Sequence, residues 1–220
     1  MGAIHLIRHG QASWGAADYD QLSELGAKQA AALGGSWEAG GFQPTWSVCG
    51  SMKRHAQTAV PALDAIDGDL YDIDSGWNEY DHLALTRVSD PADRPADARE
   101  FQAILDVALE GWVAGEAGAG QVDDGGAGEP FSAFESRVMG ALDVATEQAG
   151  SGQHVAVFTS GGPIGLVASH LLVGDASLFI AMNRVVMNAS VTTVIVGRGG
   201  RRLLAFNEHT HVPRDWQTFR

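Results

Sequence analysis

The stretch Ala3-Ile4-His5-Leu6-Ile7-Arg8-His9-Gly10 decides the fold. Its first five residues are mostly apolar, which is typical of a short buried strand, and the polar residues Arg8 and His9 follow at the end of that strand. Further along, Ser23 has the chemistry of a helix N-cap and predicts a helix from about Glu24 to Glu38. A strand followed by a loop and a helix is the first unit of a fold in which strands and helices alternate.

The alternation continues along the chain. Further strands are predicted at residues 45–49, 70–73 and 154–159, further helices at 52–63, 101–112, 131–145 and 164–173, and a hairpin at 191–206 around Gly197-Arg198-Gly199-Gly200. This order predicts an α/β fold of three layers, in which helices cover both faces of a mostly parallel sheet and the hairpin makes the sheet mixed. We expect a single domain over residues 1–220 with a helical insertion at about 83–130. The glycine-rich part of the insertion, Gly115 to Pro130, is interpreted as a surface loop, and the sequence assigns it no role.

The composition argues against several classes of protein. The chain has 220 residues, with 14 lysines and arginines against 27 aspartates and glutamates, and its net charge of −13 argues against binding to nucleic acid or to an anionic membrane. No apolar run approaches the ~18 to 20 residues of a membrane helix, and no signal peptide is recognised, so we expect a cytoplasmic protein. The single cysteine, Cys49, excludes an intrachain disulfide and a zinc site of several thiolates.

Residues with useful chemistry follow four of the predicted strands. They are, in chain order, Arg8 and His9, Arg54, Glu79, and Ser160 with Gly161. Because ligands of such sheets bind at the carboxyl ends of the strands, we expect these residues to lie close together. Arginine forks and helix N-termini bind phosphate oxygens, a histidine can attack phosphorus, and a carboxylic acid can protonate a leaving alcohol. The set therefore predicts a site for a phosphorylated molecule.

Five blocks of the sequence follow one another in a characteristic order. They are Ile7-Arg8-His9-Gly10, Leu22-Ser23-Glu24-Leu25-Gly26-Ala27-Lys28-Gln29-Ala30, Arg54 with Gln57-Thr58-Ala59, Val157-Phe158-Thr159-Ser160-Gly161-Gly162, and Asn207 with His211. Together they resemble the histidine phosphatase superfamily, the phosphoglycerate-mutase-like proteins, and only the insertion is unmatched. An Arg-His-Gly triplet alone would be a weak match, but the ordered set is specific. The resemblance implies the phosphoglycerate-mutase-like version of the α/β fold.

The resemblance also implies a role for each site residue. His9 is the implied nucleophile, which forms a phosphohistidine, and Arg8 and Arg54 are implied to hold the phosphoryl oxygens. Glu79 matches the carboxyl group that protonates the leaving oxygen and then activates water, and Gln11 is implied to position the substrate. No metal or other cofactor is implied, because the arginines supply the positive charge that a metal would give. The implied partners are a small phosphorylated substrate and inorganic phosphate, and a homo-oligomer is left open.

Ser160 is the main departure from the family. The family has a second active-site histidine here, which binds a phosphoryl oxygen, whereas serine brings one hydrogen-bond donor and no positive charge. Loss of one preorganised donor typically costs about 100- to 1,000-fold in rate. Ser160 is equally well interpreted as the cap of the helix that begins near Pro163. It could both cap that helix and donate to a phosphoryl oxygen. Gly161, the next residue, is included in the expected phosphate site.

Two smaller departures bear on the activity. Gly15 follows Trp14 where true mutases carry an asparagine, which counts against phosphoglycerate mutase activity. Gly50 replaces a serine four residues before Arg54.

Two functions therefore compete, with others less favoured. The first is a phosphomonoester hydrolase that acts through a phosphohistidine. The alternative is a phosphate- or phospho-ligand-binding protein in which Ser160 has left catalysis weak or lost. A serine hydrolase is disfavoured, because Phe158 stands where the nucleophile elbow needs a glycine. The sequence does not identify the physiological substrate.

Overall fold

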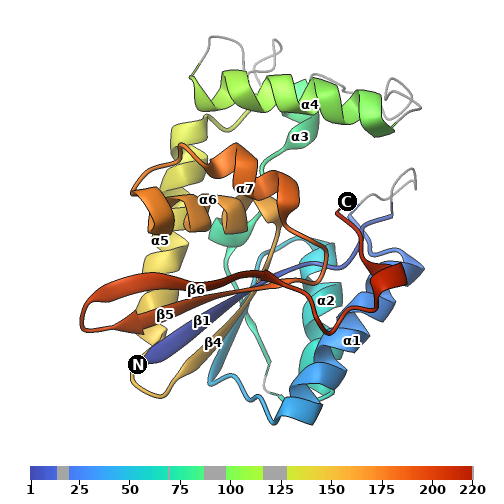
Figure 1. Cartoon of the computed structure of the whole chain (residues 1–220), viewed down its shortest axis with the longest axis vertical. Coiled ribbons are helices and arrows are strands. Elements are labelled where there is room, and N and C mark those ends of the chain that lie inside the picture. Colours follow the sequence, from blue (N-terminus) through green and yellow to red (C-terminus); the bar gives the residue numbers. More distant parts are fainter. Residues whose placement is uncertain (14–19, 69, 87–97, 116–127, 220) are drawn as a thin grey trace. The chain divides into compact units, whose positions relative to one another are not determined.

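A six-stranded sheet runs through the computed structural model, which describes residues 1–13, 20–68, 70–86, 98–115 and 128–219 (Figure 1). Its order is β3-β2-β4-β1-β5-β6. The strands are β1 (Gly2–Arg8), β2 (Trp46–Cys49), β3 (Asp72–Ile73), β4 (His154–Thr159), β5 (Val191–Gly197) and β6 (Gly200–Glu208). The helices in the described part of the chain are α1 (Glu24–Gly40), α2 (Lys53–Asp64), α3 (His82–Thr86), α4 (Ala98–Val113), α5 (Phe131–Gln148), α6 (Gly161–Val173) and α7 (Phe179–Val185).

Strand β1 lies between β4 and β5. It is parallel to β4, with Arg8 opposite Thr159, and antiparallel to β5. β2 is parallel to both β4 and β3, and β5 forms the antiparallel hairpin with β6 that the glycine-rich turn at 197–200 predicted. The sheet is therefore mixed and mostly parallel, and the predicted fold class is confirmed.

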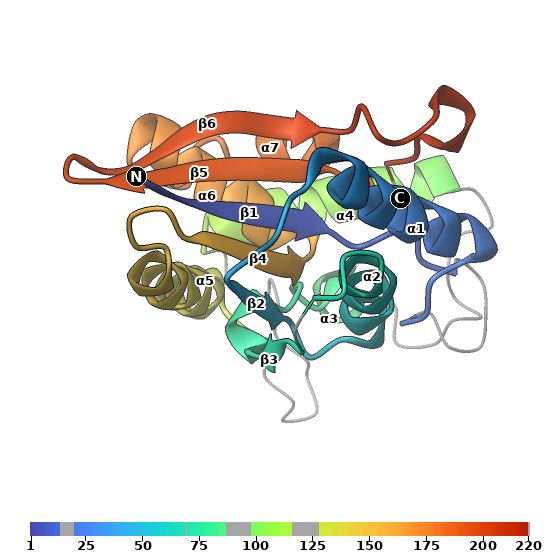
Figure 2. The ribbon, with the colours of Figure 1, turned by 90° about the horizontal axis from the view of Figure 1, so that it is seen from below.

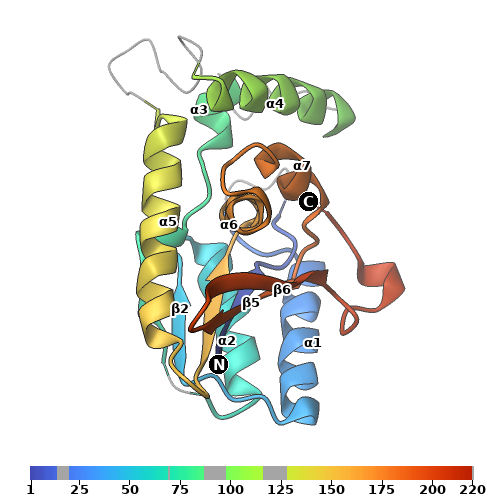
Figure 3. The same cartoon turned by 60° about the vertical axis from the view of Figure 1, so that its left-hand side comes forward.

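Helices lie on both faces of the sheet (Figures 2 and 3). On one face α1 packs against α2, and Leu33 and Ala59 of these helices join Ile7 and Phe158 of the sheet in one buried cluster. On the other face α6 packs against β1 and β6. Because both faces are covered, Leu6 and Ile7 are both fully buried, although successive strand residues point to opposite faces.

Local chemistry explains where the first helix begins and ends. The Ser23 hydroxyl accepts a hydrogen bond from the backbone amide of Gly26 at 3.0 Å, so the predicted N-cap is confirmed. The helix ends at Gly41, whose φ of 64° is in the left-handed region that glycine adopts without strain. The Ser23 cap fixes the start of α1 beside the loop that follows β1.

The chain divides into two compact units. The first contains Met1–Glu79 and Val138–Arg220, and it includes the whole sheet. The second is Tyr80–Arg137, in which the rings of Trp112 and Phe134 pack with their centroids 5.2 Å apart. The expected insertion at 83–130 falls within the second unit, and the single-domain organisation stays a prediction. Most of the expected loop from Gly115 to Pro130 lies outside the described residues.

Crossing a membrane requires a helix that is both long and apolar. Of the helices in the described residues, none is both long enough and apolar enough to span a bilayer.

Candidate active site

His9 follows β1 and is buried, with 5% of its surface exposed. Its backbone amide donates to the Thr159 carbonyl, which fixes the residue beside the end of β4. The Nδ1 atom lies 2.7 Å from the carbonyl oxygen of Gly10. Because a carbonyl oxygen only accepts, Nδ1 carries the ring hydrogen and Nε2 keeps its lone pair. Arg54 Nε donates to that lone pair at 3.1 Å.

The surroundings of His9 keep its ring neutral. Burial lowers the pKa of His9 well below 6.5, and the nearby Arg54, Arg8 and His55 lower it further, whereas the bond to Gly10 raises it. A neutral imidazole with a lone pair on Nε2 is the form in which histidine acts as a nucleophile.

Arg54 lies in the first turn of α2 and is also buried. While its Nε faces His9, its Nη1 donates to a carboxylate oxygen of Asp20 at 2.9 Å. The other oxygen of Asp20 accepts from the backbone amide of Lys53 at 2.8 Å. Asp20 therefore ties the Arg54 guanidinium to the start of α2. Sequence analysis did not single out Asp20, because an isolated acid in a loop is indistinguishable from a solvated surface residue.

Arg8 is the last residue of β1, and its guanidinium lies close to the start of α6. Its Nη1 donates to the carbonyl oxygen of Val186 and, at 3.0 Å, to that of Phe219. A Cβ added to Gly161 would lie 2.9 Å from Asn183 Oδ1 and 3.7 Å from Arg8 Nε. Gly161 therefore lies next to the guanidinium, as expected for two members of one site.

Glu79 reaches the same helix from the segment after β3. Its two carboxylate oxygens lie 3.1 and 3.2 Å from the backbone amide of Gly162, which donates to them. A helix N-terminus favours negative charge, so this position suits a carboxylate in the resting protein and a phosphoryl oxygen equally well.

Ser160 is fully buried at the N-cap position of α6. Its hydroxyl makes no capping hydrogen bond to the helix, so the interpretation of its side chain as a cap is wrong. The hydroxyl oxygen lies instead 2.6 Å from Nε2 of His55, a fully buried residue of α2. His55 was not predicted as a site residue, because a histidine within the predicted helix 52–63 is more simply interpreted as part of the core.

Gln11 lies in the loop after His9, and its side-chain oxygen and both backbone groups are hydrogen-bonded within the protein. Its side-chain oxygen accepts from the Ser23 hydroxyl at 2.8 Å, and its backbone amide donates to the side-chain oxygen of Gln29 at 2.8 Å. The amide nitrogen of Gln29 donates to Trp216 O and Thr218 Oγ1, at 2.6 and 2.9 Å. Gln11 therefore links the loop after β1 to α1, and Gln29 links α1 to the last residues of the chain.

The structure thus gathers most of the predicted set at the carboxyl ends of β1 and β4. The residues brought together are Arg8, His9, Arg54, Glu79, Ser160 and Gly161. Two guanidinium groups and a helix N-terminus lie around one neutral imidazole, which is an arrangement suited to a tetrahedral oxyanion. Across the described residues, no three His, Cys, Asp or Glu side chains are grouped so that they could hold a metal ion.

A family model of the histidine phosphatase superfamily, branch 1, matches residues 4–209. The chain belongs to the histidine phosphatase superfamily. The resemblance carried by the five sequence blocks is therefore confirmed. No curated protein sequence is similar enough to this histidine phosphatase superfamily member to count as a match.

Solved structures of the superfamily share its fold. A phosphoglycerate mutase from Bacillus anthracis is 18% identical with a TM-score of 0.64, over 96% of this chain and 95% of that one. A mycobacterial glucosyl-3-phosphoglycerate phosphatase is 20% identical with a TM-score of 0.66, over 96% and 100%. A mutant phosphoserine phosphatase from Entamoeba histolytica, in complex with phosphoserine, is 17% identical with a TM-score of 0.64, over 97% and 100%. At these identities the likeness concerns the fold alone.

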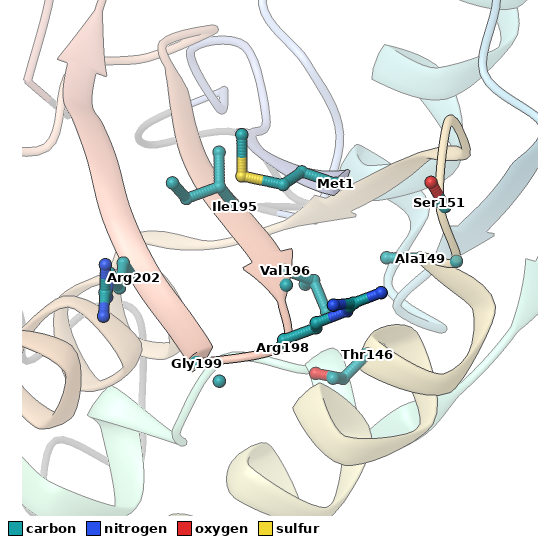
Figure 4. Close-up of a pocket in the computed structure, with 12 residues that line it drawn as sticks. Met1, Thr146, Ala149, Ser151, Ile195, Val196, Arg198, Gly199 and Arg202 are labelled. Carbon is teal, nitrogen blue, oxygen red and sulfur yellow. The ribbon is translucent and has the colours of Figure 1, made fainter.

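A cavity of about 730 Å³ lies elsewhere in this superfamily member, near the amino end of β1 (Figure 4). It is lined by Met1, by Thr146 of α5, by residues 149–151 after that helix, and by the β5–β6 hairpin, including Arg198 and Arg202. None of its lining residues carries an imidazole, a thiol or a carboxylate. The cavity and His9 therefore lie at opposite ends of β1, and the cavity lacks the groups that phosphoryl chemistry needs.

Proposed function

We propose that the chain is a phosphomonoester hydrolase that transfers the phosphoryl group of its substrate to Nε2 of His9. The observation that carries the proposal is the state of that ring. Gly10 O holds Nδ1–H at 2.7 Å, and burial keeps the pKa low, so a lone pair on Nε2 faces Arg54. Membership of the histidine phosphatase superfamily supports the same chemistry.

The proposed reaction has two steps. In the first, Nε2 of His9 forms a bond to phosphorus in line with the leaving oxygen, and the P–O ester bond breaks. Glu79, which takes up a proton from solvent when the substrate displaces it from the Gly162 amide, gives that proton to the leaving oxygen. In the second, Glu79 takes a proton from water, the resulting hydroxide forms a bond to phosphorus, and the P–N bond breaks to return neutral His9. Phosphate leaves, and the protons balance over the cycle.

Positive charge for the transferred group comes from Arg8 and Arg54. Their guanidinium groups provide preorganised donors for the equatorial oxygens, so the scheme uses no metal ion. The amide of Gly162, which binds Glu79 in the resting protein, is available to a phosphoryl oxygen once the substrate arrives. When a phosphoryl oxygen binds that amide, the Glu79 carboxyl group becomes free to approach the leaving oxygen.

Release of inorganic phosphate from a generic aryl phosphate is the first test, with wild-type protein beside His9→Ala. We expect turnover in the wild type and a loss of at least about 1,000-fold in His9→Ala, because no other group then attacks phosphorus. Denaturing gels after a brief incubation with labelled substrate will reveal an acid-labile phosphoryl group in the wild type only. No hydrolysis of any phosphate ester in a broad panel would contradict the proposal, and binding without turnover would favour the alternative of a phospho-ligand-binding protein.

The panel should begin with two substrates that the similar structures suggest. One relative is a glucosyl-3-phosphoglycerate phosphatase and another is a phosphoserine phosphatase. We propose a small phosphorylated metabolite as the substrate class, and the kcat/KM values across the panel, each compared with His9→Ala, will rank the candidates.

A further inference from the structure

His55 is a buried imidazole beside the site for which the proposed reaction has no use. It is fully buried, and its ring centroid lies 5.7 Å from that of His9. Its Nε2 is 2.6 Å from Ser160 Oγ, a short distance for a hydrogen bond between a ring nitrogen and a hydroxyl. The His55–Ser160 pair is therefore a buried polar contact next to the proposed nucleophile, His9.

The backbone at Gly50 makes room for the His55 ring. A Cβ added to Gly50 would lie 2.3 Å from His55 Nδ1 and 2.8 Å from Cε1, closer than real side chains approach. Any other residue at position 50 would therefore push the ring away from Ser160. The end of β2 and the start of α2 are shaped to hold an imidazole in this one place.

The direction of the hydrogen bond decides what Ser160 offers to a ligand. If Nε2 of His55 accepts the hydroxyl hydrogen, the lone pairs of Oγ point outward and repel an oxyanion. If Nε2–H donates to Oγ, the hydroxyl hydrogen is free to point outward and donate. Ser160 stands at the start of α6, next to Gly161 and two residues before the Gly162 amide, where an anion is favoured.

We propose that His55 is a positioning residue that donates its Nε2–H to Ser160 Oγ, so that the Ser160 hydroxyl donates to an oxygen of the transferred phosphoryl group. The proposal rests on the proposed function. Neither residue forms or breaks a bond to phosphorus, because the new bond forms at His9 and the old one breaks at the leaving oxygen. Both hydrogens stay on the atoms that donate them throughout the transfer.

Charges near His55 decide which of its nitrogens carry hydrogen. Burial and Arg54 lower the pKa of His55 well below 6.5, while the Gly50 backbone beside Nδ1 raises it. The resting ring is therefore neutral with its hydrogen on Nδ1, and Nε2 accepts from Ser160. A bound dianion opposes the effect of Arg54 and favours a second hydrogen, on Nε2, so ligand binding selects the donating form.

The first experiment removes each partner separately and together. His55→Phe keeps a ring without nitrogen, His55→Gln keeps a donor, and Ser160→Ala removes the hydroxyl. We expect kcat to fall about 100-fold in His55→Phe and in Ser160→Ala, about tenfold in His55→Gln, and no further in the double variant His55→Phe/Ser160→Ala. KM should change less than about threefold. His170→Gln on α6 is the matched histidine control and should leave kcat unchanged.

Losses that multiply in the double variant would overturn the proposal, because the two residues would then act independently. So would a His55→Phe enzyme as fast as His170→Gln. Unfolding by urea checks that each variant is folded, and Ser160→Ala with His55→Gln keeps the test available if His55→Phe does not fold.

Binding of inorganic phosphate separates this inference from the proposed function. If the wild type hydrolyses no ester, the proposed function fails, but calorimetry with phosphate still tests the pair. We expect His55→Phe and Ser160→Ala each to weaken phosphate binding about tenfold, and their combination to weaken it no further. Affinities equal to that of the wild type would overturn the inference even if the enzyme is active.

Discussion

The ring of His9 is held by two hydrogen bonds that fix its two nitrogens in different states. Gly10 O requires a hydrogen on Nδ1, and the Nε–H of Arg54 requires a lone pair on Nε2. Because both partners belong to the folded backbone or to a buried side chain, the reactive tautomer is selected before any ligand arrives. Because the folded protein keeps this imidazole neutral, the unfolded chain is favoured at low pH. The resulting loss in the free energy of unfolding grows with the lowering of the His9 pKa.

The pH dependence of the rate follows from the state of His9. Its pKa is lowered well below 6.5, so Nε2 stays unprotonated at neutral and mildly acidic pH. We expect kcat/KM, which reports the free enzyme, to stay level as pH falls through 6.5 and to drop only as pH passes the lowered pKa. Stopped assays from pH 8 downward will locate the drop. A midpoint at or above 6.5 would rule out this role for His9.

At the scale of elements, α1 touches the loop after β1 backbone to backbone. A Cβ on Gly26 would lie 2.2 Å from Gln11 O, and a Cβ on Gly10 would lie 2.4 Å from Gly26 O. The first turn of the helix therefore packs directly against the residues that follow His9. This contact explains why the loop and the helix act as one support for His9.

Two glycines of α1 provide a matched test of that contact. Gly26→Ala should destabilise the protein by about 1–3 kcal/mol, because the Gln11 backbone cannot move aside without shifting the loop. Gly35, in the same helix, has nothing within 4 Å of an added Cβ. Gly35→Ala should therefore stabilise by about 0.5–1 kcal/mol through helix propensity. Urea unfolding measures both, and equal effects of the two substitutions would mean that the contact does not constrain the helix.

The elements themselves could largely be predicted from the sequence. β4 has the predicted bounds, 154–159, because a continuous apolar run allows few alternatives, and α1 begins where Ser23 caps it. α6 begins at Gly161 rather than near Pro163, because proline is tolerated throughout the first turn, where backbone N–H groups have no partner within the helix. β3 is shorter than the predicted 70–73, because it is an edge strand that pairs only with β2.

Pairs of residues distant in sequence were not predictable. His55 and Ser160 are 105 residues apart, and only the pairing of β2 with β4 brings the start of α2 next to the start of α6. Ser160 and Gly50 stand out in the sequence as departures from the family, but their connection through His55 is visible only in the structure. The roles of Arg8, His9, Arg54, Glu79, Gln11, Ser160 and Gly161 in binding and catalysis stay predictions until the enzymatic tests above are made. Trp14 and Gly15, which bear on mutase activity, lie outside the described residues.

For the molecule as a whole, four histidines with lowered pKa values link folding to pH. They are His5, whose pKa is about 4, and His9, His55 and His211. Burial is the largest cause for each of them. In the unfolded chain these rings take up protons at about pH 6.5, so the unfolded state binds more protons than the folded state below that pH.

Stability should therefore be level above pH 7 and should fall as the pH decreases from about 6.5 toward 4. Each additional proton bound by the unfolded chain contributes about 1.4 kcal/mol per pH unit to the slope. Urea unfolding at pH 7.5, 6.5, 5.5 and 4.5 measures it. His5→Gln should flatten the curve, because it removes one of these rings. Stability that rises on acidification would contradict the assignment of these four rings as neutral.

The position of β1 between β4 and β5 has a consequence for how the protein is made. The ribosome produces the apolar run from Ala3 to Ile7 early, but its pairing partners begin at His154 and Val191. Until those segments emerge, the nascent chain exposes an unpaired apolar strand, which is a natural substrate for chaperones and a starting point for misassociation. A nascent chain that ends at residue 150 therefore contains neither a closed sheet nor His9 in its final setting.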